Sequence, residues 1–229
     1  MAQISAKEDE ERMALDRFRE ASGLLPGEVT RMNPDPWTMR SVMQAKPSIH
    51  PIAAEHFETE VLHQWDFVQR GTALMDGGLR NVDLNTFWFG LHSTVSALGN
   101  ISKVFFPARR LNQTRCVHMR TAFGVGAASL LGDRKVRNAL EHFDERVDNW
   151  AATSQRHNFA DRNVFAPGAI AGLDPSDFAR NYDPTTTVIS VFGESVDLKA
   201  VIAEVQAIVG RVQGAQRQRH ASRYGPRPI

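Results

Sequence analysis

Three residues with complementary chemistry lie close together in the stretch RNALEH, residues 137–142. His142 has a side chain that changes its charge near neutral pH, so it can give or take a proton. Arg137 keeps its charge and offers a planar fork of N–H donors that matches phosphate oxygens. Asn138 can orient the imidazole or bind the phosphate itself. These residue types suit a site that handles phosphate.

The surrounding stretch is predicted to form one long helix, from about Ser129 to Ala152. Its apolar residues step by four, three, four and three, which is typical of one buried helical face; they are Val136, Leu140, Phe143, Val147 and Trp150. At about 100° per residue, Arg137, Asn138 and His142 fall at roughly 100°, 200° and 240° from that face. We therefore expect all three side chains to point away from the core.

A helix face that points outward displays polar groups without enclosing a substrate. Asn138 and His142 are one turn apart and can touch, and Glu141 is placed to pair with Arg137. One interpretation is an ordinary solvated face with an Asn–His contact. The other is half of a site, which a second protein surface must complete.

The stretch RNALEH resembles the R-x4–6-H motif of HEPN domains (higher eukaryotes and prokaryotes nucleotide-binding). In that family the residue after the arginine is typically Asn, Asp or His, and Asn138 fits. The resemblance covers residues 51–210. It implies a helical bundle that pairs two-fold, so that two motif helices face each other in a composite site. Many members are metal-independent ribonucleases of toxin–antitoxin, abortive-infection and CRISPR-associated systems, while others bind nucleotides or lack activity.

For this chain the resemblance implies a homodimeric, metal-independent endoribonuclease of a defence or stress response, with RNA as substrate and an antitoxin among its candidate partners. In such a ribonuclease the 2′-hydroxyl of the RNA attacks the adjacent phosphate. His142 would transfer the proton of this hydroxyl, and Arg137 would stabilise the charge of the phosphorane. Asn138 would support these two residues. The alternative is a non-catalytic HEPN-like scaffold that binds a nucleotide or a protein. A scaffold would neutralise Arg137, through Glu141 or through the acidic pair Asp144 and Glu145, whereas a ribonuclease would line its groove with basic side chains.

The middle of the chain is basic. From Leu84 to Gly132 there is no aspartate or glutamate. The basic residues that we expect to contact RNA lie in or just after this stretch; they are Lys103, Arg109, Arg110, Arg115, Arg120 and Arg134. A basic segment that runs into the motif suits an anionic ligand. The alternative is that much of the segment is buried helix that avoids charge.

The predicted fold is all-α, a bundle of four to five main helices with a small C-terminal β-hairpin. Residues 1–50 read as an extension, with a charged helix over 4–21 and an irregular linker. Residues 51–210 form the helical domain, and 211–229 read as a basic, disordered tail. The elements expected within the domain are helices from Pro51 to the Asp76-Gly77-Gly78 triplet, from Asp83 to Pro107, over 112–123 and over 198–212, and a hairpin around Gly193 and Glu194.

Composition bounds the remaining possibilities. The single cysteine, Cys116, cannot form an intramolecular disulfide, and no segment reaches the roughly 20 apolar residues of a membrane span. We therefore expect a cytoplasmic protein without membrane contact. His56, Glu60 and His63 share one helical face, but a di-iron site needs further carboxylates and a second histidine from other helices, so we expect no metal. The GVGAAS stretch at 124–129 lacks the third glycine of a dinucleotide fingerprint, so we expect no cofactor.

Overall fold

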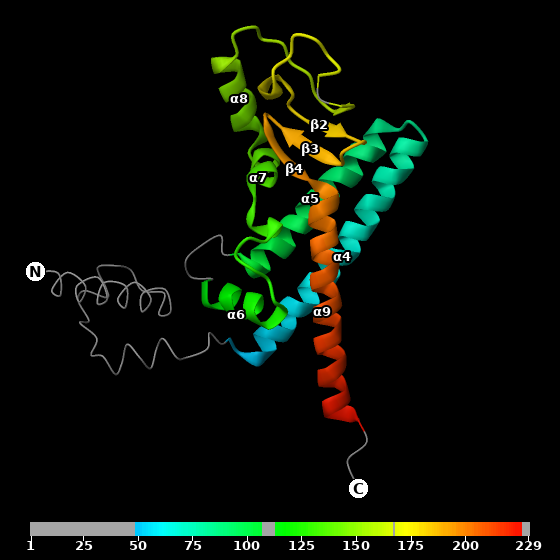
Figure 1. Ribbon diagram of the computed structural model, residues 1–229, viewed down its shortest axis with the longest axis vertical. Coiled ribbons are helices and arrows are strands. Elements are labelled where there is room, and N and C mark those ends of the chain that lie inside the picture. The colour runs from blue at the N-terminus through cyan, green and yellow to red at the C-terminus, as the bar shows by residue number, and fades with distance from the viewer. Residues whose placement is uncertain (1–48, 107–112, 167, 226–229) are drawn as a thin grey trace, which may run out of the picture.

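The computed structural model describes residues 49–106, 113–166 and 168–225. Over these residues the chain is mostly helical, as predicted, and it also contains a small four-stranded sheet. Figure 1 shows a long helical hairpin, α9 running beside it, and the sheet with two short helices gathered at one end. The expected helix over 4–21, the helix stop at Pro107, and both Arg109 and Arg110 lie outside the described residues.

The hairpin consists of α4 (Pro51–Arg80) and α5 (Leu84–Phe105). Asp83 caps the start of α5, because its carboxylate accepts hydrogen bonds from the backbone amides of Asn85 and Thr86, each at 3.1 Å. Apolar residues spaced three or four apart along α5 are buried; they are Phe87, Leu91, Val95, Leu98, Ile101 and Phe105. α5 is therefore the central helix of the core.

Glycines allow the two helices of the hairpin to approach closely. Contrary to our expectation, α4 continues through the Asp76-Gly77-Gly78 triplet and ends at Arg80. Gly78 explains the difference, because a Cβ added there would lie 2.5 Å from the Phe87 amide nitrogen. This glycine serves helix packing and does not end the helix.

Two further helices cover the hairpin. α6 (Gln113–Phe123) packs on α5, and α9 (Leu198–Tyr224) packs on α4, α6 and the sheet. The prediction of a disordered tail from residue 211 is wrong as far as Tyr224, because α9 continues through it. Two arginines of this segment pair with α4: Arg219 pairs with the buried carboxylate of Glu58, and Arg223 pairs with Glu55. Arg211 instead donates to the Phe123 carbonyl of α6.

The predicted helix over 129–152 is three shorter elements. A 3-10 turn, η2 (Leu130–Gly132), precedes α7 (Lys135–Glu141), and α8 (Phe143–Thr153) follows after a break at His142, where φ is −111° and ψ is 44°. Asp144 and Glu145 lie in the first turn of α8, where acidic side chains favour a new helix start. Val136 of α7 is buried as predicted, whereas no residue of α8 is fully buried.

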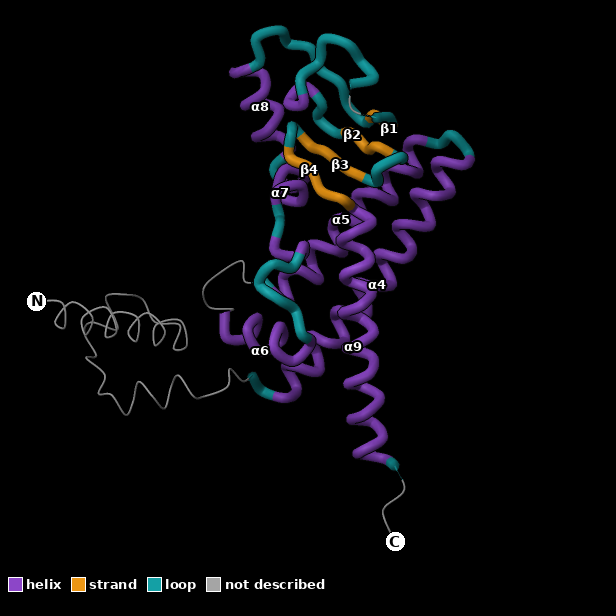
Figure 2. The backbone as a smooth tube through the Cα atoms, viewed as in Figure 1, coloured by secondary structure: helices purple, strands orange, loops and turns teal. Residues whose placement is uncertain are grey.

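The sheet is larger than the predicted hairpin. β3 (Val188–Val191) and β4 (Glu194–Asp197) form that hairpin, and its turn residues Phe192 and Gly193 both have positive φ, as a tight two-residue turn requires. β2 (Asn181–Asp183) adds antiparallel to β3, and β1 (Asn163–Val164) adds parallel to β2. Figure 2 shows the loops between α8 and β2 at the same end of the molecule as the sheet.

Candidate functional site

We predicted that the Arg137 side chain points outward, but it points into the protein. Its side chain is only 13% exposed, and one guanidinium nitrogen pairs with Glu141 at 3.1 Å. The other donates to the Gly99 carbonyl of α5 at 3.5 Å, and Nε is buried without a hydrogen-bond partner in the described residues. The cause lies on α5, because a Cβ at Gly99 would lie 2.3 Å from the Arg137 Cδ. The stem of the arginine occupies the space that glycine leaves.

The cavity behind Arg137 is small and mostly apolar. It holds about 50 Å³ and is bordered by Val95, Leu98 and Gly99 of α5, Val201 of α9 and the motif arginine. Ligand pockets usually hold about 300–1,000 Å³, so this space cannot take a nucleotide. A substrate at the motif would have to bind on its outer side.

Asn138 and His142 are exposed, as predicted. The His142 side chain is 59% exposed, and its Nδ1 lies 3.4 Å from the Glu145 carboxylate. No hydrogen bond joins the Asn138 and His142 side chains, although the His142 amide donates to the Asn138 carbonyl at 2.9 Å. The structure therefore brings the three motif residues onto one short segment but directs Arg137 to the inner side of α7.

Arg134 lies one turn before Asn138. The Asn138 amide donates to the Arg134 carbonyl at 2.8 Å, so Arg134, Asn138 and His142 follow one another at intervals of four residues along the same side. Within the part of the chain that the structure describes, the Arg134 side chain has no ion pair or hydrogen bond. Arg134 is half-buried and also borders the cavity behind Arg137, so it is a partly exposed cation one turn before the exposed part of the motif.

Among the described residues, the other basic side chains predicted to bind RNA, Lys103, Arg115 and Arg120, serve mainly internal contacts. Arg115 donates to the Lys103 carbonyl at 2.8 Å, and its guanidinium lies 4.4 Å from the Phe57 ring centre. Arg120 lies 5.3 Å from the Phe106 ring centre, and the Lys103 Nζ donates to Asn100 at 3.2 Å. These cation–π and backbone contacts indicate roles in helix packing. They do not form a basic groove beside the motif.

The glycine-rich loop before the motif is also occupied by an internal contact. Backbone amides that precede a helix are groups that can receive a phosphate. The Leu130 amide instead donates to the carboxylate of Glu204, on α9, at 2.9 Å, and the Leu131 amide donates to the Ser129 hydroxyl at 3.3 Å. A carboxylate thus lies where an anionic ligand would have to bind.

Sequence reasoning missed a polar cavity of about 230 Å³ between α8 and η3 (Pro175–Asp177). Its floor is Asp177, whose carboxylate accepts from Trp150 Nε1 at 3.1 Å and from the Asp174 amide at 2.9 Å. These hydrogen bonds lower the pKa of Asp177, with the Asp174 amide as the largest cause. Arg146, Arg156, Asp174 and Asp177 line the cavity, so its charges balance and favour neither an anion nor a cation.

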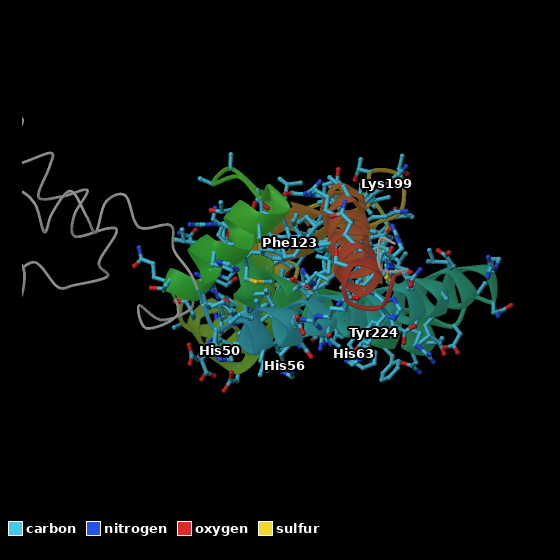
Figure 3. The ribbon with its side chains drawn as sticks, turned by 90° about the horizontal axis from the view of Figure 1, so that it is seen from below. His50, His56, His63, Phe123, Lys199 and Tyr224 are labelled. Carbon is cyan, nitrogen blue, oxygen red and sulfur yellow. The ribbon has the colours of Figure 1, made fainter. Side chains whose placement is uncertain are left out.

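Among the described residues no group of three or more His, Cys, Asp or Glu side chains is arranged to hold a metal ion. Figure 3 shows His56 and His63 along the edge of α4, away from Phe123 at the end of α6. Both are exposed. Cys116 is buried.

The helices in the described ranges include none long and apolar enough to cross a membrane. Comparison with known proteins gives no match among protein-family models, curated proteins or solved structures.

Proposed function

We propose that the protein is a non-catalytic, HEPN-like binding scaffold. The observation that carries the proposal is the environment of Arg137, which pairs with Glu141 and packs its stem over Gly99. An arginine that stabilises a phosphorane must present its fork to phosphate oxygens. Here the fork is directed to a carboxylate and a backbone carbonyl, and Glu141 would repel an approaching phosphate.

The arrangement of the helices supports the HEPN-like part of the proposal. α4, α5, α6 and α9 pack together, and the segment with the R-x4–6-H pattern lies against this group through α5 and the sheet. In this interpretation Arg137 is a packing residue that ties α7 to α5. The motif then contributes to the stability of the scaffold and not to chemistry.

The second candidate is a metal-independent endoribonuclease, which the row of Arg134, Asn138 and His142 favours. His142 is accessible for proton transfer, and Arg134 has no partner within the described ranges and could bind the phosphate instead of Arg137. A second copy would still have to provide the opposite surface of the site.

An RNA cleavage assay in EDTA separates the two candidates. We expect the wild-type protein to leave a broad RNA pool intact, and Arg137→Ala to lower the stability of the fold. Cleavage that yields 2′,3′-cyclic phosphate ends and that disappears in His142→Ala, but not in the control His63→Ala, would establish the ribonuclease. Loss of that cleavage in Arg134→Ala with retention in Arg137→Ala would assign the phosphate contact to Arg134.

A further inference from the structure

The outer face of the α4–α5 hairpin carries a group of exposed apolar side chains. Phe67 and Leu74 of α4 are 52% and 38% exposed, and Phe89 of α5 is 66% exposed. They border a groove of about 430 Å³ between the two helices, which we call the α4–α5 groove. Single exposed apolar residues are ordinary, but a group of them around a hollow marks an interaction surface.

The floor of the groove is made of small residues. Gly71 of α4 packs so tightly on α5 that an added Cβ would lie 2.9 Å from the Gly90 carbonyl oxygen. Ser93, Ser96 and Ala97 continue the lining along α5. The groove therefore combines large apolar side chains at its border with a floor that can receive large side chains.

The groove is nearly uncharged. Arg70 is the one charged residue that borders it in the described chain, and its Nε pairs with the Asp66 carboxylate at 2.7 Å. The phosphate backbone of a nucleic acid is negatively charged and would require several unpaired cations on the protein, so a nucleic acid does not suit this surface. The adjacent Asp66 and Arg70 have opposite charges, so the border of the groove is complementary to a copy of itself.

From these features we infer that a second copy of this chain binds in the α4–α5 groove. In a two-fold interface each surface meets itself, so it must contain both the projecting groups and the hollow that receives them. Phe67 and Phe89 of each copy enter the groove of the other, and Asp66 of each copy lies opposite Arg70. The two hairpins together form a four-helix layer.

This dimer differs from the one that the motif predicted. At about 100° per residue, Ser93 and Asn100, which border the groove, lie roughly 100–160° around α5 from Val95 and Gly99, which border the cavity beside the motif arginine. Two copies joined through the groove therefore keep their motifs apart. The inference goes beyond the proposed scaffold function and does not depend on whether the chain cleaves RNA.

Sedimentation velocity of the full chain at about 1–100 µM tests the inference, since stable interfaces of this kind have affinities in this range or tighter. We expect the wild type to sediment as a dimer of two 25.6 kDa chains. Phe67→Glu and Phe89→Glu should sediment as monomers with unchanged far-UV circular dichroism, because both side chains are exposed in a single chain. Their melting temperatures should no longer depend on protein concentration, since that dependence comes from dimerisation. The matched control Ile52→Glu changes a residue of α4 that is 72% exposed and outside the groove, and it should remain a dimer.

Two results would overturn the inference. A wild type that is monomeric at the highest concentration leaves the groove to a different partner. A dimer that persists in Phe89→Glu places the interface elsewhere, for example at the motif helices. The proposed function fails separately, through RNA cleavage in EDTA, so the two failures are distinguishable.

Discussion

The conformation of Arg137 is set by a residue on another helix. Gly99 gives the arginine stem room to lie against α5, and Glu141 then holds the guanidinium from the same helix. The angle of Arg137 on its own helix predicted an outward side chain because a helical projection contains no information about the neighbour. The Arg137–Glu141 pair itself followed from the four-residue spacing and is confirmed. A long side chain can turn from the flank of a helix towards any space nearby.

His92 is the residue with the clearest expected pH response. Burial is the main cause that lowers its pKa, the Arg180 charge lowers it further, and Asp161 opposes both. The folded state therefore binds a proton less readily than the unfolded chain, whose histidines titrate near 6.5. The stability that neutral His92 contributes is therefore fully present above about pH 6.5 and is lost as the pH falls below that value towards the lower pKa of the folded state.

Chemical denaturation between about pH 8 and pH 5 tests this expectation. As the pH is lowered, His92 should reduce the free energy of unfolding of the wild type by less than about 1.4 kcal/mol per pH unit. The contribution is limited because the imidazole is only part-buried and solvent screens it. His92→Gln should lose that component, whereas the exposed control His63→Gln should keep it. Equal slopes in the wild type and His92→Gln would contradict the assignment.

At the scale of elements, the α4–α5 hairpin depends on glycines with different roles. A Cβ added at Gly77 would have no atom within 4 Å. A Cβ added at Gly78 would lie 2.5 Å from the Phe87 amide nitrogen and 2.8 Å from the Asp83 carbonyl oxygen. Both backbone atoms belong to the capped start of α5, which cannot shift without loss of the cap.

Alanine at these two adjacent positions should therefore have opposite effects on stability. Gly77→Ala removes the entropic penalty of glycine in a helix and should raise the free energy of unfolding by about 0.5–1 kcal/mol. Gly78→Ala should lower it by about 1–3 kcal/mol, because the helices must separate. Urea unfolding of both variants provides the measurement. If Gly78→Ala is as stable as Gly77→Ala, the close approach of the helices is wrong.

The elements that could be predicted from sequence are those whose signals are local. The Asp83 cap and the β3–β4 hairpin are each contained within a few neighbouring residues, and the apolar period of α5 repeats every three or four residues along one helix. The break at His142 was missed because the apolar spacing continues across it, although the residues before and after contact different partners. Val136 is buried in the core, whereas Phe143 contacts Phe192 of the hairpin turn, with ring centres 5.5 Å apart. The parallel β1–β2 pair joins segments about 18 residues apart, and no local sequence pattern predicts such a pairing.

At the scale of the whole molecule, the chain presents two different kinds of surface. The motif side combines ion pairs and polar side chains, and the α4–α5 groove is apolar with one balanced pair of charges. The two surfaces lie on different sides of α5. The inferred dimer therefore leaves the motif side accessible to further partners.

Ionic strength should distinguish these two surfaces. We expect the dissociation constant of the dimer to change by less than about threefold between about 50 and about 500 mM NaCl, because apolar contacts are little affected by charge screening. Sedimentation equilibrium at both salt concentrations provides the values. The exposed Asp66 and Arg70 pairs across the interface add little to this dependence. A weakening of the dimer by about tenfold or more would therefore indicate that further charged groups, such as those on the motif side, hold the copies together.

The pairing of Arg219 with Glu58 has a consequence for the synthesis of this protein. Glu58 lies near the start of the described chain, and its partner follows 161 residues later. At about 5–20 residues per second, a ribosome takes roughly 8–30 s to add that length. The α4–α5 hairpin can form early in that interval, but its buried carboxylate and the surface that α9 covers remain open to water until α9 has been synthesised. Nascent chains of this protein should therefore engage chaperones at the α9-binding surface of the hairpin, and release should coincide with the emergence of α9.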